Sequence, residues 1–345
     1  MRIGYAPYSP DLSPPADRRR FPFYARERGL EFEFADPDST YDLVVATPRA
    51  DLQAWSRYRP GQAKVVFDIV DSYLDFPRWN PKAILRGPAK FLAGEAPHPF
   101  FSYRRAVERM LERADAAVCA TPEQAALMAP LNANIHAIID FQSDGAVRVK
   151  DDYRAGSPFQ LVWEGLPNNA DFFGEISSAL AEVHRRHPLL LHIVAPLEYK
   201  EFVQRFWLRE TYRVVSRHFD HVKLHEWSAK TVSDVATSSD VAVIPLPIDR
   251  RFVSLKSENK LISFWQMGLP TVTSATPAYA RAMSEAGQDL ACATQEEWID
   301  RLLRLIDDQK ARRGAGQSGR EFAEREYSND RLMEAWDRVF GSLES

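Results

Sequence analysis

The chain has 345 residues, 45% of them hydrophobic and 27% charged, which is the composition of a soluble globular protein long enough for two domains. A formal net charge of −4 lacks the basic bias of nucleic-acid-binding proteins, so no nucleic-acid partner is expected. The two cysteines do not form a disulfide framework or a CxxC metal site. We find no signal peptide and no run of about 18 apolar residues, and we expect a cytoplasmic protein.

Short apolar runs alternate with helical patterns through the first half. The predicted strands are residues 2–5, 43–46, 64–67, 116–119 and 134–138, and the predicted helices are residues 16–27, 49–57, 103–113 and 122–129. The last helix has clear start signals: Thr121 can cap it, Pro122 takes its first position, and Gln124 lies three residues after the cap.

After residue 139 the sequence DFQSDGAVRVKDDYRAGSP loses its apolar pattern and is predicted to be a linker. A second series follows, with strands at 160–163, 189–194, 222–224, 241–245 and 271–274, and helices at 172–187, 200–217, 229–237, 257–267, 296–308 and 319–326. Such alternation predicts an α/β protein with two Rossmann-like parallel-sheet domains, residues 1–150 and 151–327, facing a cleft.

A polar cluster follows the predicted strand 241–245. In open parallel sheets, ligands bind outside the carboxyl ends of the strands, and this loop lies at such an end. Ser257 is the predicted N-cap of the next helix, whose free N–H groups favour an anion. Lys256 and Lys260 flank that helix start, so a phosphate is the expected ligand.

Four stretches resemble family-4 glycosyltransferases of the two-domain GT-B fold. They are ERMLERADAAVCATPEQAALMAPLNANIHAIID, LVWEGLPNNADFFGEISSALAEV, KSENKLISFWQMGLPTVTSATPAY and RRGAGQSGREFAEREYSNDRLMEAWDRVF. The resemblance covers most of the second half well and the first half loosely. It implies that a C-terminal helix, within residues 328–345, crosses back to the first domain.

The resemblance implies a retaining transfer of a sugar, of hexosyltransferase type, from a nucleotide-sugar donor to a glycan or lipid-linked acceptor, in cell-surface polysaccharide synthesis. No metal or other cofactor is required by the family's front-face mechanism. Trp227 is either a platform for the base or core filler. The implied donor-binding residues are Trp163, Gly165, Asn168, Asn169, Trp227, Asp249, Lys256, Ser257, Asn259, Lys260 and Tyr279.

Two departures from the family pattern affect this site. Leu166 and Asn168 stand where the family has a cationic pair, and Leu255 and Ser263 stand where it has two glutamates. The Lys-Ser-x-Asn-Lys cluster is the expected substitute. Two alternatives stay open: a sugar-nucleotide epimerase or hydrolase of the same fold, and a catalytically silent nucleotide-sugar-binding scaffold subunit.

The acceptor side is expected at the carboxyl ends of first-domain strands. Asp68, Asp71 and Asp75 follow the strand 64–67 and share a face if that segment is helical. One of these aspartates is expected to orient the acceptor hydroxyl, and Asp71 is the catalytic candidate among them, beside Lys256 and Lys260. The alternative is that the segment is a solvated turn with no role in binding. The loop with Tyr8 and Ser9 is expected to touch phosphate or acceptor.

Three further motifs each allow a functional interpretation and a structural one. GAGQSG follows a helix rather than a strand, so it is predicted to be a helix break and not a dinucleotide fingerprint. His184 and His187 are expected at a solvated helix end rather than in a metal site. The segment from Phe76 to Gly94 carries a cation every four residues among aromatic and aliphatic residues. This segment predicts either association with the inner face of the cell membrane or a loop packed on the first domain.

Overall fold

The computed structural model describes residues 1–345 except 59–62, 76–101, 142–147, 201–207, 251–252 and 345. The chain divides into two compact units. Unit 1 comprises Met1–Ser143, Leu255–Ser257 and Asn329–Ser345, and unit 2 comprises Asp144–Ser254 and Glu258–Ser328. In the part of the chain that the structure describes, no helix is long and apolar enough to cross a membrane.

Unit 1 is built on a parallel sheet of six strands in the order β2-β1-β3-β4-β5-β6. The strands are β1 (Ile3–Ala6), β2 (Glu33–Phe34), β3 (Leu43–Ala46), β4 (Lys64–Asp68), β5 (Ala116–Cys119) and β6 (Ile135–Ala137). Strands β1, β3 and β5 are buried along their whole length, which explains why they appear in the sequence as continuous apolar runs. The five strands predicted in this half are confirmed, and β2 is the one that was missed.

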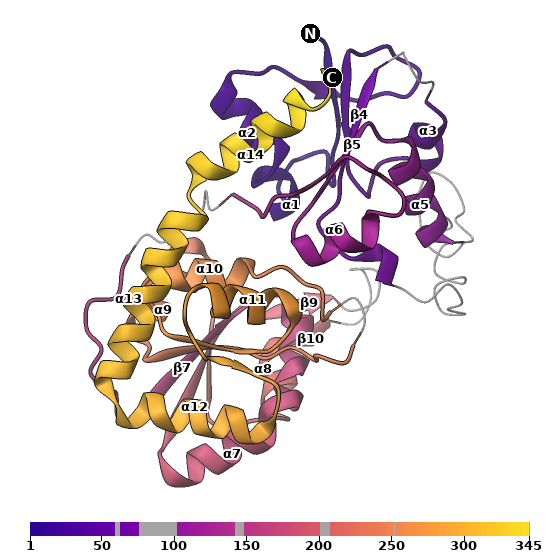
Figure 1. Ribbon diagram of the computed structural model, residues 1–345. Coiled ribbons are helices and arrows are strands. Elements are labelled where there is room, and N and C mark those ends of the chain that lie inside the picture. The colour runs from indigo at the N-terminus through magenta and orange to yellow at the C-terminus, as the bar shows by residue number, and fades with distance from the viewer. Residues whose placement is uncertain (59–62, 76–101, 142–147, 201–207, 251–252, 345) are drawn as a thin grey trace. The chain divides into compact units, whose positions relative to one another are not determined.

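The helices of unit 1 are α1 (Pro15–Arg18), α2 (Phe21–Arg28), α3 (Leu52–Arg57), η1 (Tyr73–Asp75), α5 (Tyr103–Arg113), α6 (Pro122–Met128) and α14 (Asn329–Gly341). Helix α6 begins as predicted, because Thr121 Oγ1 accepts the backbone N–H of Gln124 at 3.1 Å. The C-terminal helix α14 lies beside α2 in Figure 1. Its Trp336 stacks on Tyr24 of α2, so the end of the chain is part of the core of unit 1.

Unit 2 has a second six-stranded parallel sheet, in the order β11-β8-β7-β12-β13-β14. The strands are β7 (Phe159–Glu164), β8 (Leu189–Val194), β11 (Val222–His225), β12 (Val241–Ile244), β13 (Thr271–Ser274) and β14 (Ala291–Cys292). The five strands predicted here are confirmed, and the two-residue edge strand β14 was missed. With β7 and β12 at the centre, loops that follow these two strands lie at the middle of the sheet edge.

The helices of unit 2 are η2 (Pro167–Ile176), α7 (Ser177–Arg186), α8 (Thr211–Val215), α9 (Ala229–Ser238), α10 (Asn259–Gln266), α11 (Pro277–Glu285), α12 (Gln295–Asp307) and α13 (Gln309–Glu326). Helix α12 has a complete capping box. The side chain of Thr294 accepts the backbone N–H of Glu297, and the side chain of Glu297 accepts the backbone N–H of Thr294. No helix was predicted at the position of α11.

The predicted helix over residues 200–217 is wrong. Strands β9 (Glu198–Lys200) and β10 (Leu208–Glu210) pair antiparallel, and among the residues of this range that the structure describes, helix is confined to Thr211–Val215. An amphipathic pattern of this length is compatible with either state, because β-strand pairing depends on a partner strand that the local sequence does not reveal.

The predicted helix break at GAGQSG is also wrong. The motif lies inside a helix and does not follow a strand, which is consistent with its not being a dinucleotide fingerprint. All six residues lie within the continuous helix α13, which packs on α10. A Cβ on Gly316 would lie 2.3 Å from the carbonyl oxygen of Gly268, and one on Gly319 would lie 2.5 Å from Trp265 Cδ1. The glycines therefore let two helices approach closely.

We expect Gly316→Ala to lower the free energy of unfolding by about 1–3 kcal/mol, because the new methyl group meets a backbone oxygen that cannot move aside. The matched control is Gly314→Ala in the same helix, where nothing lies within 4 Å of the added Cβ. That control should stabilise the protein by about 1 kcal/mol through helix propensity. Urea denaturation of both variants measures the contrast, and equal effects would contradict the close packing.

Candidate functional site

The carboxyl end of β7 lies at the middle of the sheet of unit 2. Trp163 is buried, Glu164 is the last residue of the strand, and Gly165 begins the turn. A Cβ on Gly165 would lie 2.5 Å from the ring of Trp163 and 3.0 Å from Lys260 Nζ. Only a glycine lets the indole and the lysine come this close to the backbone.

Lys260 reaches this strand end from the first turn of α10. Its ammonium group donates to the backbone oxygen of Glu164 at 2.8 Å and to Glu164 Oε2 at 2.9 Å. It also lies 5.7 Å from the centroid of the Trp163 ring, within the range of a cation–π contact. The structure therefore brings three predicted donor-binding residues together: Trp163, Gly165 and Lys260.

Trp227 joins the same cluster from the loop after β11. Its indole Nε1 donates to Glu164 Oε1 at 3.0 Å, and 37% of the residue is exposed. The core-filler interpretation is therefore wrong. Its role as a platform for a base stays a prediction.

The loop before α10 differs from the prediction in one respect. Ser257 is not the N-cap, because α10 begins at Asn259 and the cap position is Glu258. The Leu255–Ser257 segment belongs to unit 1, where the backbone oxygen of Leu255 accepts from Gln124 Nε2 at 3.0 Å. Lys256 and Ser257 are thus assigned to unit 1, whereas Asn259 and Lys260 belong to unit 2.

The other predicted donor-binding residues do not join the Lys260 contacts. Asn168 and Asp249 are exposed, and the backbone N–H of Asn169 donates to Leu166 within the turn at 2.9 Å. Tyr279 is only 2% exposed, so its side chain does not line an open surface as predicted. Burial, followed by the charges of Glu258 and Glu164, raises the pKa of the Tyr279 hydroxyl well above its usual value.

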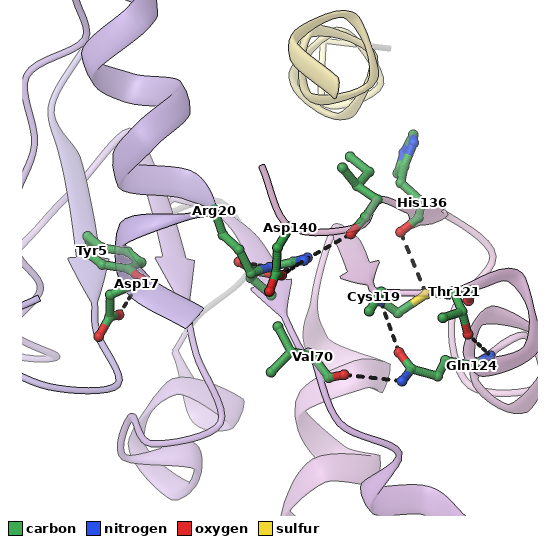
Figure 2. Close-up of polar contacts among 12 residues, drawn as sticks. Tyr5, Asp17, Arg20, Val70, Cys119, Thr121, Gln124, His136 and Asp140 are labelled. Atoms are coloured by element: carbon green, nitrogen blue, oxygen red, sulfur yellow. Dashed lines mark hydrogen bonds and ion pairs between the residues drawn. The ribbon is translucent and has the colours of Figure 1, made fainter. Parts of the chain in front are cut away.

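The acceptor-side prediction fails for Asp68. This residue is fully buried, and Arg20 Nε donates to its two oxygens at 2.8 and 3.0 Å. Arg20 Nη1 donates to Asp140 Oδ1 at 3.0 Å and to the backbone oxygen of Ile138 at 2.9 Å (Figure 2). Asp68 therefore holds the sheet, α2 and the segment after β6 together, and it is not presented to a ligand.

Asp68, Asp71 and Asp75 do not share a helix face, because Asp68 ends β4 and only Tyr73–Asp75 forms a helical turn, η1. Asp75 is partly buried, and so is Asp71. Burial raises the pKa of Asp71, while the positive charge of Lys256 opposes that rise. Asp71 thus combines partial access with a raised pKa.

The loop with Tyr8 and Ser9 is anchored by the buried Asp17. Its carboxylate accepts the backbone N–H groups of Tyr8 at 2.8 Å and Ser9 at 3.0 Å, and the hydroxyl of Tyr5 at 2.6 Å (Figure 2 shows Tyr5 beside Asp17). The hydroxyl of Tyr8 is buried and has no hydrogen-bond partner among the described residues. A buried hydroxyl of this kind is a candidate partner for a ligand.

His184 lies in the last turn of α7. Its Nδ1 accepts the backbone N–H of Leu189 at 3.1 Å, and its ring stacks on His221. Across the described ranges, no group of three or more histidine, cysteine or acidic residues is placed to hold a metal ion. A cavity of about 270 Å³ lies beside β10 and α8 and contains no predicted site residue; it is lined by Leu208, Arg209, Glu210, Arg213, Val214 and Arg217.

Glu164 belongs to the candidate site, although the sequence pattern did not predict it. Its carboxylate connects Trp227 and Lys260, which are 33 residues apart in the sequence. One signal was available: an acidic residue ends a predicted central strand immediately before a glycine, at the sheet edge where an anion was expected.

No protein-family model and no curated protein matches this sequence. Among solved structures, HepE of Anabaena, in complex with UDP and glucose, is similar over 99% of this chain and 100% of its own, with a TM-score of 0.63 and 11% identity. TarM is similar over 86% of this chain with a TM-score of 0.61 and 11% identity. A TarM mutant from S. aureus, in complex with Fondaparinux, alpha-GlcNAc-glycerol and UDP, has a TM-score of 0.58 and 11% identity over 86% of this chain.

The chain spans about half the length of TarM, 54% in one structure and 55% in the other. At this level of identity the likeness concerns the fold alone. The chain has two six-stranded parallel sheets with their helices, and it is similar in structure to GT-B proteins, one of which it matches over its full length. This protein therefore has the GT-B fold.

Proposed function

We propose that this protein is a glycosyltransferase that moves a sugar from a nucleotide-sugar donor to a glycan or lipid-linked acceptor. The observation that carries the proposal is the end-to-end likeness to HepE, which was solved with UDP and glucose. The cation Lys260 at the carboxyl end of the central strand β7 supports it, since ligands of open parallel sheets bind at this edge.

In the proposed mechanism, Lys260 stabilises the diphosphate leaving group as charge develops on it. The departing phosphate oxygen takes the proton of the attacking acceptor hydroxyl, so the bond to the acceptor forms on the face that the nucleotide leaves, with retention of configuration. The protein supplies position and charge rather than a covalent intermediate, and the scheme uses no metal. These features, and a hexosyl donor, follow the family-4 resemblance.

The acceptor is proposed to bind unit 1 near Asp71. The raised pKa of that carboxyl group suits a residue that accepts a hydrogen bond from a hydroxyl, and the buried Tyr8 hydroxyl offers a second polar contact. Ser9 and Asp75 complete the proposed acceptor side. Asp68 is withdrawn from it because Arg20 occupies both of its oxygens.

The proposed setting is cell-surface polysaccharide synthesis at the cytoplasmic face of the membrane. The basic and aromatic segment at residues 76–94, which carries the membrane proposal, lies outside the described residues. A second candidate is a catalytically silent nucleotide-sugar-binding subunit. Leu255 and Ser263 in place of the family's glutamates favour it, together with the pairing of Lys260 to Glu164.

Calorimetry with UDP, GDP, dTDP and CMP tests the donor site. We expect one nucleotide to bind the wild type, and Lys260→Ala to weaken that binding about 10-fold to 100-fold, because a lysine–phosphate contact contributes about 1.5–3 kcal/mol. Lys310→Ala, an exposed lysine of α13, is the control and should leave the affinity unchanged.

Two outcomes would contradict the proposal. Unchanged affinity in Lys260→Ala would remove this lysine from the site. Binding of none of the four nucleotides to the wild type would remove the donor site itself. Transfer of sugar from the matching donor separates the enzyme from the silent subunit, which would bind the nucleotide without turnover.

A further inference from the structure

Lys260 has an internal anionic partner at the position where a donor phosphate is proposed to bind. Glu164 places Oε2 2.9 Å from Lys260 Nζ and Oε1 3.0 Å from Trp227 Nε1, so both carboxylate oxygens are engaged. The pair of Lys260 and Glu164 has no net charge. A phosphate that approaches Lys260 therefore meets a neutralised cation with a carboxylate beside it.

Lys260 does not need this carboxylate to hold its position. The backbone oxygen of Glu164 accepts from Nζ at 2.8 Å, and the Trp163 ring lies beneath the ammonium group. The absence of a side chain at Gly165 leaves room for the lysine, since a Cβ there would be 3.0 Å from Nζ. The contact with the carboxylate is thus additional to a lysine that backbone and indole already fix.

The pair is accessible to a ligand from solvent. The side chain of Lys260 is 30% exposed and that of Glu164 is 25% exposed. Trp227, the third member, is 37% exposed. A solute can therefore reach the ammonium group and take the place of Glu164 Oε2 without unfolding any strand or helix.

We infer that Glu164 is an internal competitor for Lys260, and that its carboxylate sets how strongly the site binds the diphosphate of a nucleotide. A diphosphate binds by displacing Glu164 Oε2 from Nζ, while the backbone oxygen and the indole keep the lysine in place. The carboxylate opposes anions and leaves uncharged ligands unaffected. This inference rests on the proposed function, because it concerns the same donor site.

The test is calorimetry on the full chain with UDP, GDP, dTDP and CMP, and with the nucleoside of whichever nucleotide binds. Glu164→Gln removes the charge and keeps an oxygen that can accept from Trp227. We expect the nucleoside diphosphate to bind this variant about fivefold to tenfold more tightly than the wild type, through loss of one adjacent like charge. The nucleoside should bind both proteins equally.

Glu175→Gln is the matched control, because it makes the same charge change on a partly exposed glutamate of unit 2 that pairs only loosely with Arg250, at 3.4 Å. It should leave the affinity at the wild-type value. Equal or weaker binding by Glu164→Gln, or equal tightening by Glu175→Gln, overturns the inference and leaves the proposed function standing. Failure of every nucleotide to bind either the wild type or Glu164→Gln overturns both.

Discussion

Replacing Arg20 by Met is expected to lower the free energy of unfolding by about 3–5 kcal/mol, the usual effect of removing one partner from a buried ion pair. Arg20 is fully buried and bonds to Asp68, to Asp140 and to the backbone oxygen of Ile138. Without the guanidinium group, two buried carboxylates would face each other with no cation. Urea denaturation followed by circular dichroism measures the loss.

The loss should depend on pH. Burial already raises the pKa of Asp68, and removal of Arg20 takes away the largest effect that lowers it. When the folded-state pKa of an aspartate lies above the unfolded value of about 3.9, the folded protein loses stability as the pH rises above that value. At a pH low enough to protonate the carboxyl group in both the folded and the unfolded state, this loss disappears. The difference between Arg20→Met and the wild type should therefore be larger at pH 7 than at pH 4.

Arg26→Met is the control for Arg20→Met, since Arg26 lies on the same helix, α2, with a side chain that is 66% exposed. An exposed pair contributes about 0–1 kcal/mol, so this variant should stay close to the wild type. Adding Asp68→Leu to Arg20→Met removes one uncompensated carboxylate and should recover part of the loss. Similar stability of the Arg20 and Arg26 variants would show that the buried cluster is not needed for folding.

Truncating Trp336 to Ala is expected to lower the free energy of unfolding by about 3–5 kcal/mol, the usual range for a buried tryptophan. Trp336 is fully buried on α14, where its ring stacks on Tyr24 at 5.7 Å and on Phe340 at 6.2 Å. The guanidinium group of Arg20 lies 5.9 Å from the same ring. The last helix therefore contributes to the core of unit 1, although it comes more than 180 residues after β6.

Glu334→Ala is the control for Trp336→Ala because Glu334 is exposed on the same helix, and it should change the stability by less than about 0.5 kcal/mol. Trp336→Phe keeps most of the apolar surface and should lose less than Trp336→Ala. Equal stability of Trp336→Ala and Glu334→Ala would contradict the packing of α14 on unit 1.

The sequence alone determined the class of the fold and the place of the candidate site. Ten strands were predicted from apolar runs, and each lies within a residue or two of its observed bounds, because a strand buried on both faces needs a continuous apolar sequence. The rule that ligands meet the carboxyl ends of such strands then selected the loop that leads to Lys260, and the resemblance to family-4 glycosyltransferases implied Trp163 and Gly165. The structure brings these three into contact.

Only the tertiary structure decided which charges meet. Glu164 pairs with Lys260, 96 residues away, and Arg20 pairs with Asp68 and Asp140, 48 and 120 residues away. No local pattern encodes such distances, so Asp68 was assigned to a ligand and Glu164 was overlooked. The hairpin β9–β10 and the unbroken α13 were missed for the same physical reason. Strand pairing and close helix packing are properties of two segments, whereas a sequence pattern describes only one.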